Sequence, residues 1–272
     1  MKSVTSIQNL FSLNNKNIIL TGSAGRLGTQ FAHILSKAGA NTILVDINDR
    51  KNKKLENSIK KQYHTNPRSY QVDISNQNEV KKFTTQIIKD YKIIYGLVNN
   101  AFYSPLQNTD KASLPFEKFQ VEIWNKMLDV NLTGIFLCCK EIGKVMVKQK
   151  SGVIVNISSI YGMVGADQRI YGKSKLNSSI AYAATKGGLV NMTRYLAAYW
   201  QRKNIRVNTL TLGGVLDKYM DKKFIKNYEQ KTILGRMGNK EEFGPALLFL
   251  ISNASSYMTG VNLVIDGGWT AW

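Results

Sequence analysis

Two side chains in the second half of the chain have the types and the spacing needed for proton transfer. Tyr182 and Lys186 stand four positions apart in the run AYAATKGGLVNMTRYLAAYW. The run lacks proline, and apolar residues recur in it at helical spacing, so we expect a helix that carries both side chains on one face. A nearby ammonium favours the phenolate and lowers the pKa of a tyrosine. We therefore expect Tyr182 to exchange a proton near neutral pH.

This spacing is weak support by itself, because Tyr and Lys four apart also occur on any half-exposed helix face. A second pair, Tyr171 and Lys175, has the same spacing in the run YGKSK. The choice between the two pairs depends on the elements around them.

A glycine-rich turn near the N-terminus indicates a dinucleotide site. Residues 17–46 read as a strand at Ile18–Leu20, a turn with glycines, a helix, and a strand at Thr42–Val45. The glycines are Gly22, Gly25 and Gly28. Glycines allow close backbone approach, and the N–H groups of a helix N-terminus attract a pyrophosphate. A strand, turn, helix and strand of this size is typical of dinucleotide binding.

Asp46, at the end of the second strand, bears on which dinucleotide is bound. A carboxylate there accepts hydrogen bonds from the adenosine ribose and repels a 2′-phosphate, which favours NAD over NADP. Arg26 and Arg50 work against that preference. The alternative is that Asp46 is a solvated turn residue.

The rest of the chain continues to alternate strands and helices. Further strands are expected at 68–72, 153–157, 205–211 and 262–265, and within 96–101, which runs into a polar loop. Helices are expected within 49–66, after Ser75 or Asn76, at Phe116–Val130 and Leu132–Lys148 with Asn131 between them, and at Lys240–Ile251. Residues 102–116 read as a loop. This order predicts an α/β fold: one three-layer, Rossmann-like domain over residues 1–272 with a doubly wound parallel sheet.

Composition limits the classes of function. Of the 272 residues 43% are hydrophobic, enough for a large core, and the net charge is +19. We attribute the charge mainly to a lysine-rich composition, with attraction of anionic small molecules second and nucleic acid a distant third. No apolar run is long enough for a membrane span, and the N-terminus lacks a secretory signal, which favours the cytoplasm. Cys138 and Cys139 read as buried thiols, and no metal site is expected.

From about residue 10 to the C-terminus the chain resembles the short-chain dehydrogenase/reductase family in its single-domain form. The resemblance rests on motifs that occur in the family's order: Thr21-Gly22 to Gly28, Asp73, Asn99-Asn100-Ala101, Asn131, Ser158-Ser159, Tyr182-Ala183-Ala184-Thr185-Lys186, and Asp266-Gly267-Gly268. It also favours Tyr182 over Tyr171, because the family's active-site helix continues as KGGLVNMTRYLA does.

The resemblance implies hydride transfer between a nicotinamide and a carbonyl or alcohol. It implies Tyr182 as the acid or base, Lys186 as the group that tunes it and holds the ribose, Ser159 on the substrate oxygen, and Asn131 in a water relay. Cofactor contacts are implied for Gly22, Ser23, Gly25, Arg26, Leu27, Gly28, Asp46, Asp73, Ile74, Asn100, Ala101, Tyr182, Lys186 and Val215. It also implies a homodimer or homotetramer.

Four departures from the family pattern stand out. Arg26 follows Gly25, where single-domain members usually place glycine, and Leu212 replaces the usual proline after the sixth strand. Asp217 stands where a threonine often contacts the cofactor, so we expect a looser lid over 214–230. The connection 160–181 is long, and its insertion Asp167–Ser179 is expected to cover the active site and serve the substrate.

The insertion and the ending DGGW are also similar to oxidoreductases of bacterial surface-sugar pathways, including flagellin modification. This predicts an NAD(H)-dependent enzyme for a sugar or nucleotide sugar. Two alternatives stay open. One is an NADPH-dependent 3-oxoacyl-thioester reductase, and the other is a dinucleotide-binding protein without catalysis.

Overall fold

The computed structural model describes residues 6–105, 114–174 and 177–272, and its core is a seven-stranded sheet. The strand order is β3-β2-β1-β4-β5-β6-β7, and every pairing is parallel. The strands are β1 Asn17–Thr21, β2 Asn41–Asp46, β3 Arg68–Gln71, β4 Gly96–Asn99, β5 Gly152–Ser159, β6 Ile205–Leu212 and β7 Asn262–Ile265. The expected doubly wound α/β fold is confirmed.

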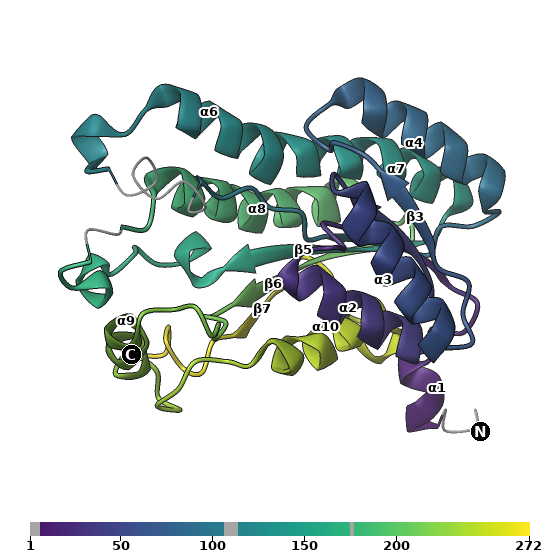
Figure 1. Cartoon of the computed structure of the whole chain (residues 1–272). Coiled ribbons are helices and arrows are strands. Elements are labelled where there is room, and N and C mark those ends of the chain that lie inside the picture. Colours follow the sequence, from purple (N-terminus) through teal and green to yellow (C-terminus); the bar gives the residue numbers. More distant parts are fainter. Residues whose placement is uncertain (1–5, 106–113, 175–176) are drawn as a thin grey trace.

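Helices cover both faces of the sheet in three layers (Figure 1). One face carries α2 Arg26–Lys37, α3 Asp49–Gln62 and α10 Gly244–Ile251. The other carries α4 Gln77–Asp90, α7 Ile135–Gln149 and α8 Ile180–Tyr199, with α6 Val121–Leu128 beside α8. The short α1 Ile7–Phe11 lies near the N-terminus, and α9 Lys222–Glu229 lies near the C-terminus at the left of Figure 1.

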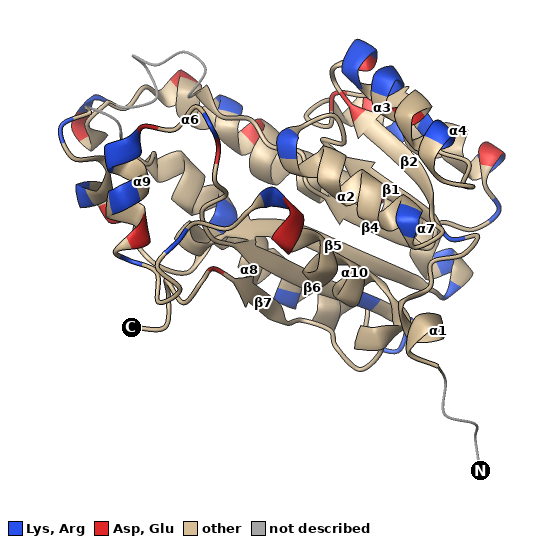
Figure 2. Ribbon diagram, turned by 60° about the horizontal axis from the view of Figure 1, so that its bottom comes forward, with Lys and Arg blue, Asp and Glu red and all other residues tan. Residues whose placement is uncertain are grey.

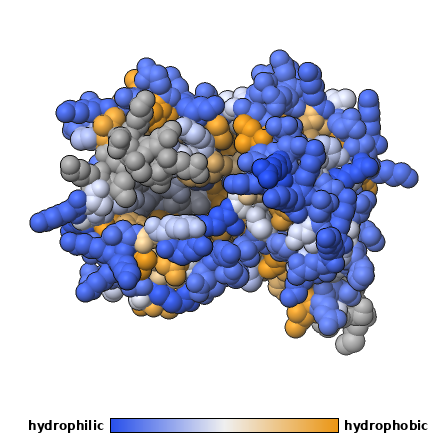
Figure 3. All heavy atoms as spheres, in the orientation of Figure 1, coloured by the Kyte–Doolittle hydropathy of each residue, from blue (hydrophilic) through white to orange (hydrophobic). Residues whose placement is uncertain are grey.

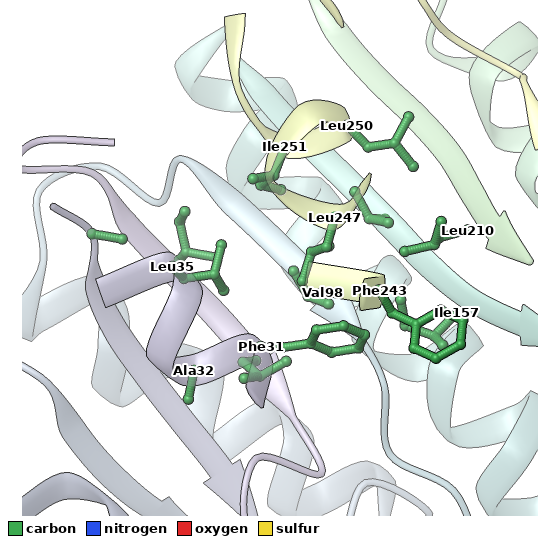
Figure 4. Packing of buried hydrophobic residues seen from close by; sticks show 14 of the residues in the cluster. Phe31, Ala32, Leu35, Val98, Ile157, Leu210, Phe243, Leu247, Leu250 and Ile251 are labelled. Atoms are coloured by element: carbon green, nitrogen blue, oxygen red, sulfur yellow. The ribbon is translucent and has the colours of Figure 1, made fainter. Parts of the chain in front are cut away.

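Each face of the sheet has its own apolar core. Ile18 and Leu20 of β1 belong to the cluster around α2, α3 and α10, whereas Ile19 between them belongs to the cluster around α4, α7 and α8. Figure 4 shows Phe31 of α2 among side chains of α10 and the central strands. Because parallel strands are covered on both faces, they are apolar at successive positions rather than at alternate ones.

The position of the site follows from the strand order. The chain proceeds outward from β1 to β3 and then crosses back to β4, on the other side of β1. In such sheets the loops after the strands diverge at this switch point and leave a crevice at the carboxyl ends. The turns after β1, β2, β4, β5 and β6 therefore converge there.

Several helix boundaries differ from the expected ones. The helix predicted from Phe116 begins at Val121, after a 3-10 turn at Phe116–Lys118, because Phe116 is exposed and no buried contact draws that turn into the helix. The predicted helix Lys240–Ile251 divides into a 3-10 turn at Lys240–Phe243 and α10. Helices α1 and α9 were not predicted. Of the expected loop 102–116, residues 106–113 lie outside the described part of the chain.

The surface is basic and mostly hydrophilic. Lys and Arg are spread over α3, α4, α9 and several loops, with acidic residues among them (Figure 2). On the face seen in Figure 3, hydrophobic residues form small separate groups. No helix among the described residues is long and apolar enough to cross a membrane. Both cysteines are buried and free, as expected.

Candidate active site

A cavity of about 840 Å³ lies at the carboxyl ends of the strands. One end is lined by the glycine-rich turn, Asp46, Asn48 and Lys51. The middle is lined by the end of β5 with Tyr182 and Lys186, and the other end by the insertion and the segment that leads into α9. The volume is in the range of cofactor and ligand pockets.

The glycine turn forms a cradle that side chains would fill. Gly22 has φ +62° and lies against Ala101, where an added Cβ would be 2.6 Å from its Cα. A Cβ on Gly28 would be 2.0 Å from the Gly22 carbonyl oxygen, so the helix packs directly on the turn. Gly25 is the N-cap of α2, no side chain caps the helix there, and the first turn of α2 lines the cavity. This arrangement fits a bound pyrophosphate.

Asp46 borders the cavity and is held by backbone N–H groups. Its Oδ2 accepts from Ala24 N at 2.9 Å, and its Oδ1 accepts from Asn48 N at 2.8 Å. Each carboxylate oxygen keeps a second lone pair. Asp46 is therefore a fixed acceptor rather than a solvated turn residue, and it has capacity left for ribose hydroxyls.

Several other expected cofactor contacts hold neighbouring backbone in place around the cavity. Ser23 is fully buried, and its hydroxyl donates to Asn52 at 2.7 Å. Asn100 does line the cavity, and its amide donates to the Thr21 and Gly22 carbonyls at 3.1 and 3.0 Å. The lining described for the cavity does not include Ser23, Asp73, Ile74 or Ala101.

Ala101, Asp73 and Ile74 each make a defined contact with neighbouring segments. The Ala101 N–H donates to Thr21 Oγ1 at 3.1 Å, and the Asp73 carboxylate accepts from the Ser75 hydroxyl at 2.6 Å. Ile74 is buried where Gly134 approaches it. The family motifs thus include residues that support the backbone around the cavity as well as residues that line the cavity.

The structure brings Ser159, Tyr182 and Lys186 together in the middle of the cavity. Ser159 ends β5, and its hydroxyl lies near the Tyr182 phenol, whose pKa it lowers. The start of α8 is fixed by Ser179, whose Oγ accepts from Tyr182 N at 3.2 Å. Lys186, one turn later, is only 4% exposed, and its Nζ donates to the Ile157 carbonyl at 2.8 Å.

The expectation that Lys186 lowers the pKa of Tyr182 is wrong for this structure. Burial raises the pKa of Tyr182, and the hydrogen bond from Ser159 lowers it by less. Burial also lowers the pKa of Lys186, to about 8, because desolvation disfavours its charged form. The Lys186 Nζ lies 5.9 Å from the centre of the Tyr182 ring and bonds to a carbonyl instead.

Asn131 lies in a π-helical turn, Asp129–Gly134, that joins α6 to α7. It is fully buried, and its side chain pairs with the backbone of Tyr103: Oδ1 accepts from Tyr103 N at 2.7 Å, and Nδ2 donates to Tyr103 O at 3.0 Å. The Asn131 amide therefore fixes the loop after β4.

Arg26 and Asp217, two of the departures from the family pattern, fix the segment after β6 in place and do not loosen it. Arg26 of the glycine turn forms an ion pair with Asp217 and donates to the Val215 carbonyl at 3.3 Å. Gly214 N donates to the Tyr228 hydroxyl of α9 at 2.5 Å. Val215 lines the cavity as expected and pairs with Gly238.

Sequence reasoning missed much of the aromatic wall. Phe102 contacts the Tyr182 ring edge-on with centroids 5.3 Å apart, and Tyr161 does so at 6.2 Å. Tyr171, set aside above in favour of Tyr182, lines the same cavity. Lys175, four positions after Tyr171, lies outside the described residues. No periodicity marked Phe102 or Tyr161, because Phe102 lies in the loop after β4 and Tyr161 in a short 3-10 turn.

No group of three or more His, Cys, Asp and Glu side chains in residues 6–105, 114–174 and 177–272 is arranged to hold a metal ion.

Comparison with known proteins places the whole chain among related oxidoreductases. A family model described as enoyl-(acyl carrier protein) reductase matches residues 22–270. The NAD-dependent glycerol dehydrogenase of Listeria innocua is 31% identical over 264 residues, 96% of each chain. The 3-oxoacyl-[acyl-carrier-protein] reductase of Chlamydia muridarum is 33% identical over 94% of this chain and 98% of its own. The post-translational flagellin modification protein A of Campylobacter coli is 30% identical over 94% and 99%.

Solved structures agree over almost the full length. A short-chain dehydrogenase from Leptospira borgpetersenii with bound NAD+ superposes with a TM-score of 0.83 at 32% identity, covering 99% of this chain and 98% of that one. A gluconate 5-dehydrogenase from Burkholderia cenocepacia in complex with NADP and tartrate gives 0.86 at 26%, covering 98% and 100%.

Proposed function

The chain belongs to the short-chain dehydrogenase/reductase family of NAD(P)-dependent oxidoreductases, and from this premise we propose that it interconverts a secondary hydroxyl of a neutral polyol or sugar and the corresponding ketone, with NAD as its cofactor. The substrate is a small molecule that enters the cavity at the end away from the glycine turn.

The distribution of charge in the cavity carries this proposal. Cations in the described lining are Arg26 and Lys51 at the glycine turn and Lys186 in the middle. The substrate end carries the hydroxyls of Ser178, Tyr161, Tyr171 and Tyr219, and one carboxylate, Asp221. Hydroxyls suit a polyhydroxylated neutral substrate, and the described lining at this end includes no cation that would bind a phosphate. We therefore favour a free polyol or sugar over a nucleotide sugar.

The central residues divide the work of proton transfer. A nicotinamide dinucleotide supplies hydride chemistry when bound in this cavity. Tyr182 takes the proton of the substrate hydroxyl during oxidation and returns it during reduction. Ser159, whose hydroxyl lies near the Tyr182 phenol, positions the substrate oxygen beside it. Lys186, one helical turn after Tyr182, would bind the nicotinamide ribose. Asn131 fixes the loop after β4 through the Tyr103 backbone.

The preference for NAD rests on Asp46. Its carboxylate borders the cavity where the adenosine ribose of a bound dinucleotide would lie, and it would repel a 2′-phosphate. Lys51 on the same wall opposes this preference, as do Arg26 and Arg50. The opposition of Arg26 is weakened, because its ion pair with Asp217 neutralises its charge.

A second candidate is the NADPH-dependent reduction of a 3-oxoacyl thioester. It is favoured by the 33% identity to the Chlamydia muridarum reductase. Asp46 and the hydroxyl-rich substrate end weigh against it. A role limited to dinucleotide binding is disfavoured by family membership and by the assembled Ser159, Tyr182 and Lys186.

Assembly and compartment are further parts of the proposal. We propose a homodimer or homotetramer, supported by the exposed apolar residues Phe136 on α7 and Tyr195 and Tyr199 on α8. We propose the cytoplasm as the compartment, since two free thiols suit a reducing environment.

The test begins with thermal unfolding in the presence of NADH or NADPH, because a ligand of the folded state raises the midpoint. We expect the larger shift with NADH. NAD-dependent oxidation is then measured with glycerol, threitol and longer polyols, and NADPH-dependent reduction with an acetoacetyl thioester. Oxidation of at least one polyol supports the proposal, and thioester reduction without polyol oxidation would replace it with the second candidate.

A further inference from the structure

Tyr171 reaches the substrate end of the cavity from the insertion. It is partly buried and lines the cavity together with Tyr161 and Tyr182. Burial raises the pKa of Tyr171, and the hydroxyls of Ser178 and Tyr161, which face it, lower it by less. Its phenol is therefore protonated at neutral pH and can both donate and accept a hydrogen bond.

Helix α9 fixes the position of Tyr171. The Tyr171 ring lies against that of Phe224 with centroids 5.2 Å apart. One residue earlier, the buried Ile170 accepts from Asn227 Nδ2 at 3.0 Å through its carbonyl. The segment Asp167–Ser174 thus packs on the helix that follows the β6 loop, although 57 positions separate the two bonded residues in the sequence.

A second contact joins the two segments farther from the cavity. Lys231, just after α9, forms an ion pair with Asp167 at 2.8 Å, and the Lys231 carbonyl accepts from the Trp272 indole at 3.1 Å. These contacts hold the insertion, α9 and the C-terminal residues together. Tyr171 therefore has a defined place in the pocket wall, whereas a side chain on an unsupported loop would not.

The location of Tyr171 relative to Tyr182 determines which part of a bound substrate the Tyr171 hydroxyl can contact. Tyr161 contacts the ring of Tyr182, and its hydroxyl faces that of Tyr171. Tyr171 is thus displaced from the proton-transfer group toward the substrate end, where a substrate extends beyond its reacting carbon. The nearby Asp221 is engaged as the N-cap of α9, accepting from Phe224 N at 2.9 Å.

We propose that Tyr171 is a specificity-determining residue, whose hydroxyl binds a hydroxyl of the polyol beyond the reacting carbon. The inference rests on the proposed function for the class of substrate. It assigns to the insertion one direct contact with that substrate, and it predicts a preference for polyols over simple secondary alcohols.

Binding without turnover tests this contact separately from the proposed function. The protein is loaded with NADH, with which an alcohol cannot react, and threitol or propan-2-ol is titrated by calorimetry. Tyr171→Phe is compared with the wild type and with Tyr257→Phe, a control at an exposed tyrosine between α10 and β7. We expect Tyr171→Phe to weaken threitol binding about 10-fold and propan-2-ol binding less than about 2-fold, as for loss of one hydrogen bond.

Each outcome decides the inference. Unchanged threitol affinity in Tyr171→Phe, equal weakening for both alcohols, or no threitol binding by the wild type would overturn it. The proposed function is judged by wild-type oxidation of polyols, so binding that depends on Tyr171 without any oxidation would reject the function and keep the contact.

Discussion

Arg26 and Asp217 form an ion pair at the edge of the cavity, with 2.5 Å between Nη1 and Oδ2, although 191 positions separate them in the chain. Arg26 belongs to the glycine turn that would hold the pyrophosphate, and Asp217 to the segment after β6. Arg26 and Val215 both line the cavity, so the pair joins two segments of the cavity wall.

Breaking this pair should change cofactor release more than stability. In Asp217→Asn we expect NADH to dissociate about 3- to 10-fold faster in stopped-flow displacement, because the segment after β6 is no longer held to the turn. The unfolding midpoint should hardly move, since exposed ion pairs contribute little to stability. Lys53→Gln, which breaks an exposed pair on α3, is the control. Release that is unchanged or slower in Asp217→Asn would contradict the prediction.

Removing the Tyr182 hydroxyl should stop turnover without loss of the cofactor. For Tyr182→Phe we expect kcat to fall by about 10²- to 10⁴-fold, the usual contribution of a positioned acid or base. The NADH-induced shift in unfolding midpoint should stay at the wild-type value. Ser159→Ala should also lower kcat, because the substrate oxygen loses its second partner. Activity retained in Tyr182→Phe would reject the assignment.

The buried ammonium of Lys186 should make stability depend on pH in the unliganded protein. Its pKa is about 8 in the folded state against 10.5 for the free side chain, so between these values the unfolded chain binds more protons. Stability contributed by this group therefore rises with pH from about 8 to 10.5, by roughly 3 kcal/mol in total. We expect the free energy of unfolding of the wild type, measured relative to Lys186→Met, to rise over this range. A flat difference would show that Lys186 is not desolvated.

Two glycines of the turn should respond differently to alanine. A Cβ on Gly28 meets the Gly22 carbonyl oxygen at 2.0 Å, so Gly28→Ala should lower the unfolding midpoint without any cofactor present. A Cβ on Gly25 meets only that same oxygen, at 3.2 Å, and otherwise extends into the cavity. Gly25→Ala should therefore keep the midpoint of the unliganded protein but lose most of the NADH-induced shift. A full shift in Gly25→Ala would argue against the cradle.

Local sequence patterns were sufficient to predict the helices and strands whose formation depends mainly on residues close in sequence. The glycine spacing between two apolar strands predicted the turn and the first turn of α2, and all seven strands were placed to within about two residues, because strand and helix periods are local properties. The same periodicity placed Tyr182 and Lys186 one turn apart on α8. Periodicity placed the start of the helix wrongly at Phe116. The sequence there is compatible with a helix, but Phe116 is exposed and α6 begins at Val121.

Only the tertiary structure decided how the site residues are used. Ser23 and Asn131 belong to the motif, but long-range contacts turn them inward, to Asn52 and to Tyr103. Tyr171 enters the cavity because α9 supports it, which no spacing shows.

The direction of the Tyr182 pKa shift is also a tertiary result. Four-residue spacing puts Lys186 on the correct face of α8, yet the pKa depends on desolvation and on where the ammonium bonds, and both are set by strands packed against the helix. Sequence periodicity therefore determined which residues reach the carboxyl edge of the sheet, and packing between distant segments determined their protonation and their partners.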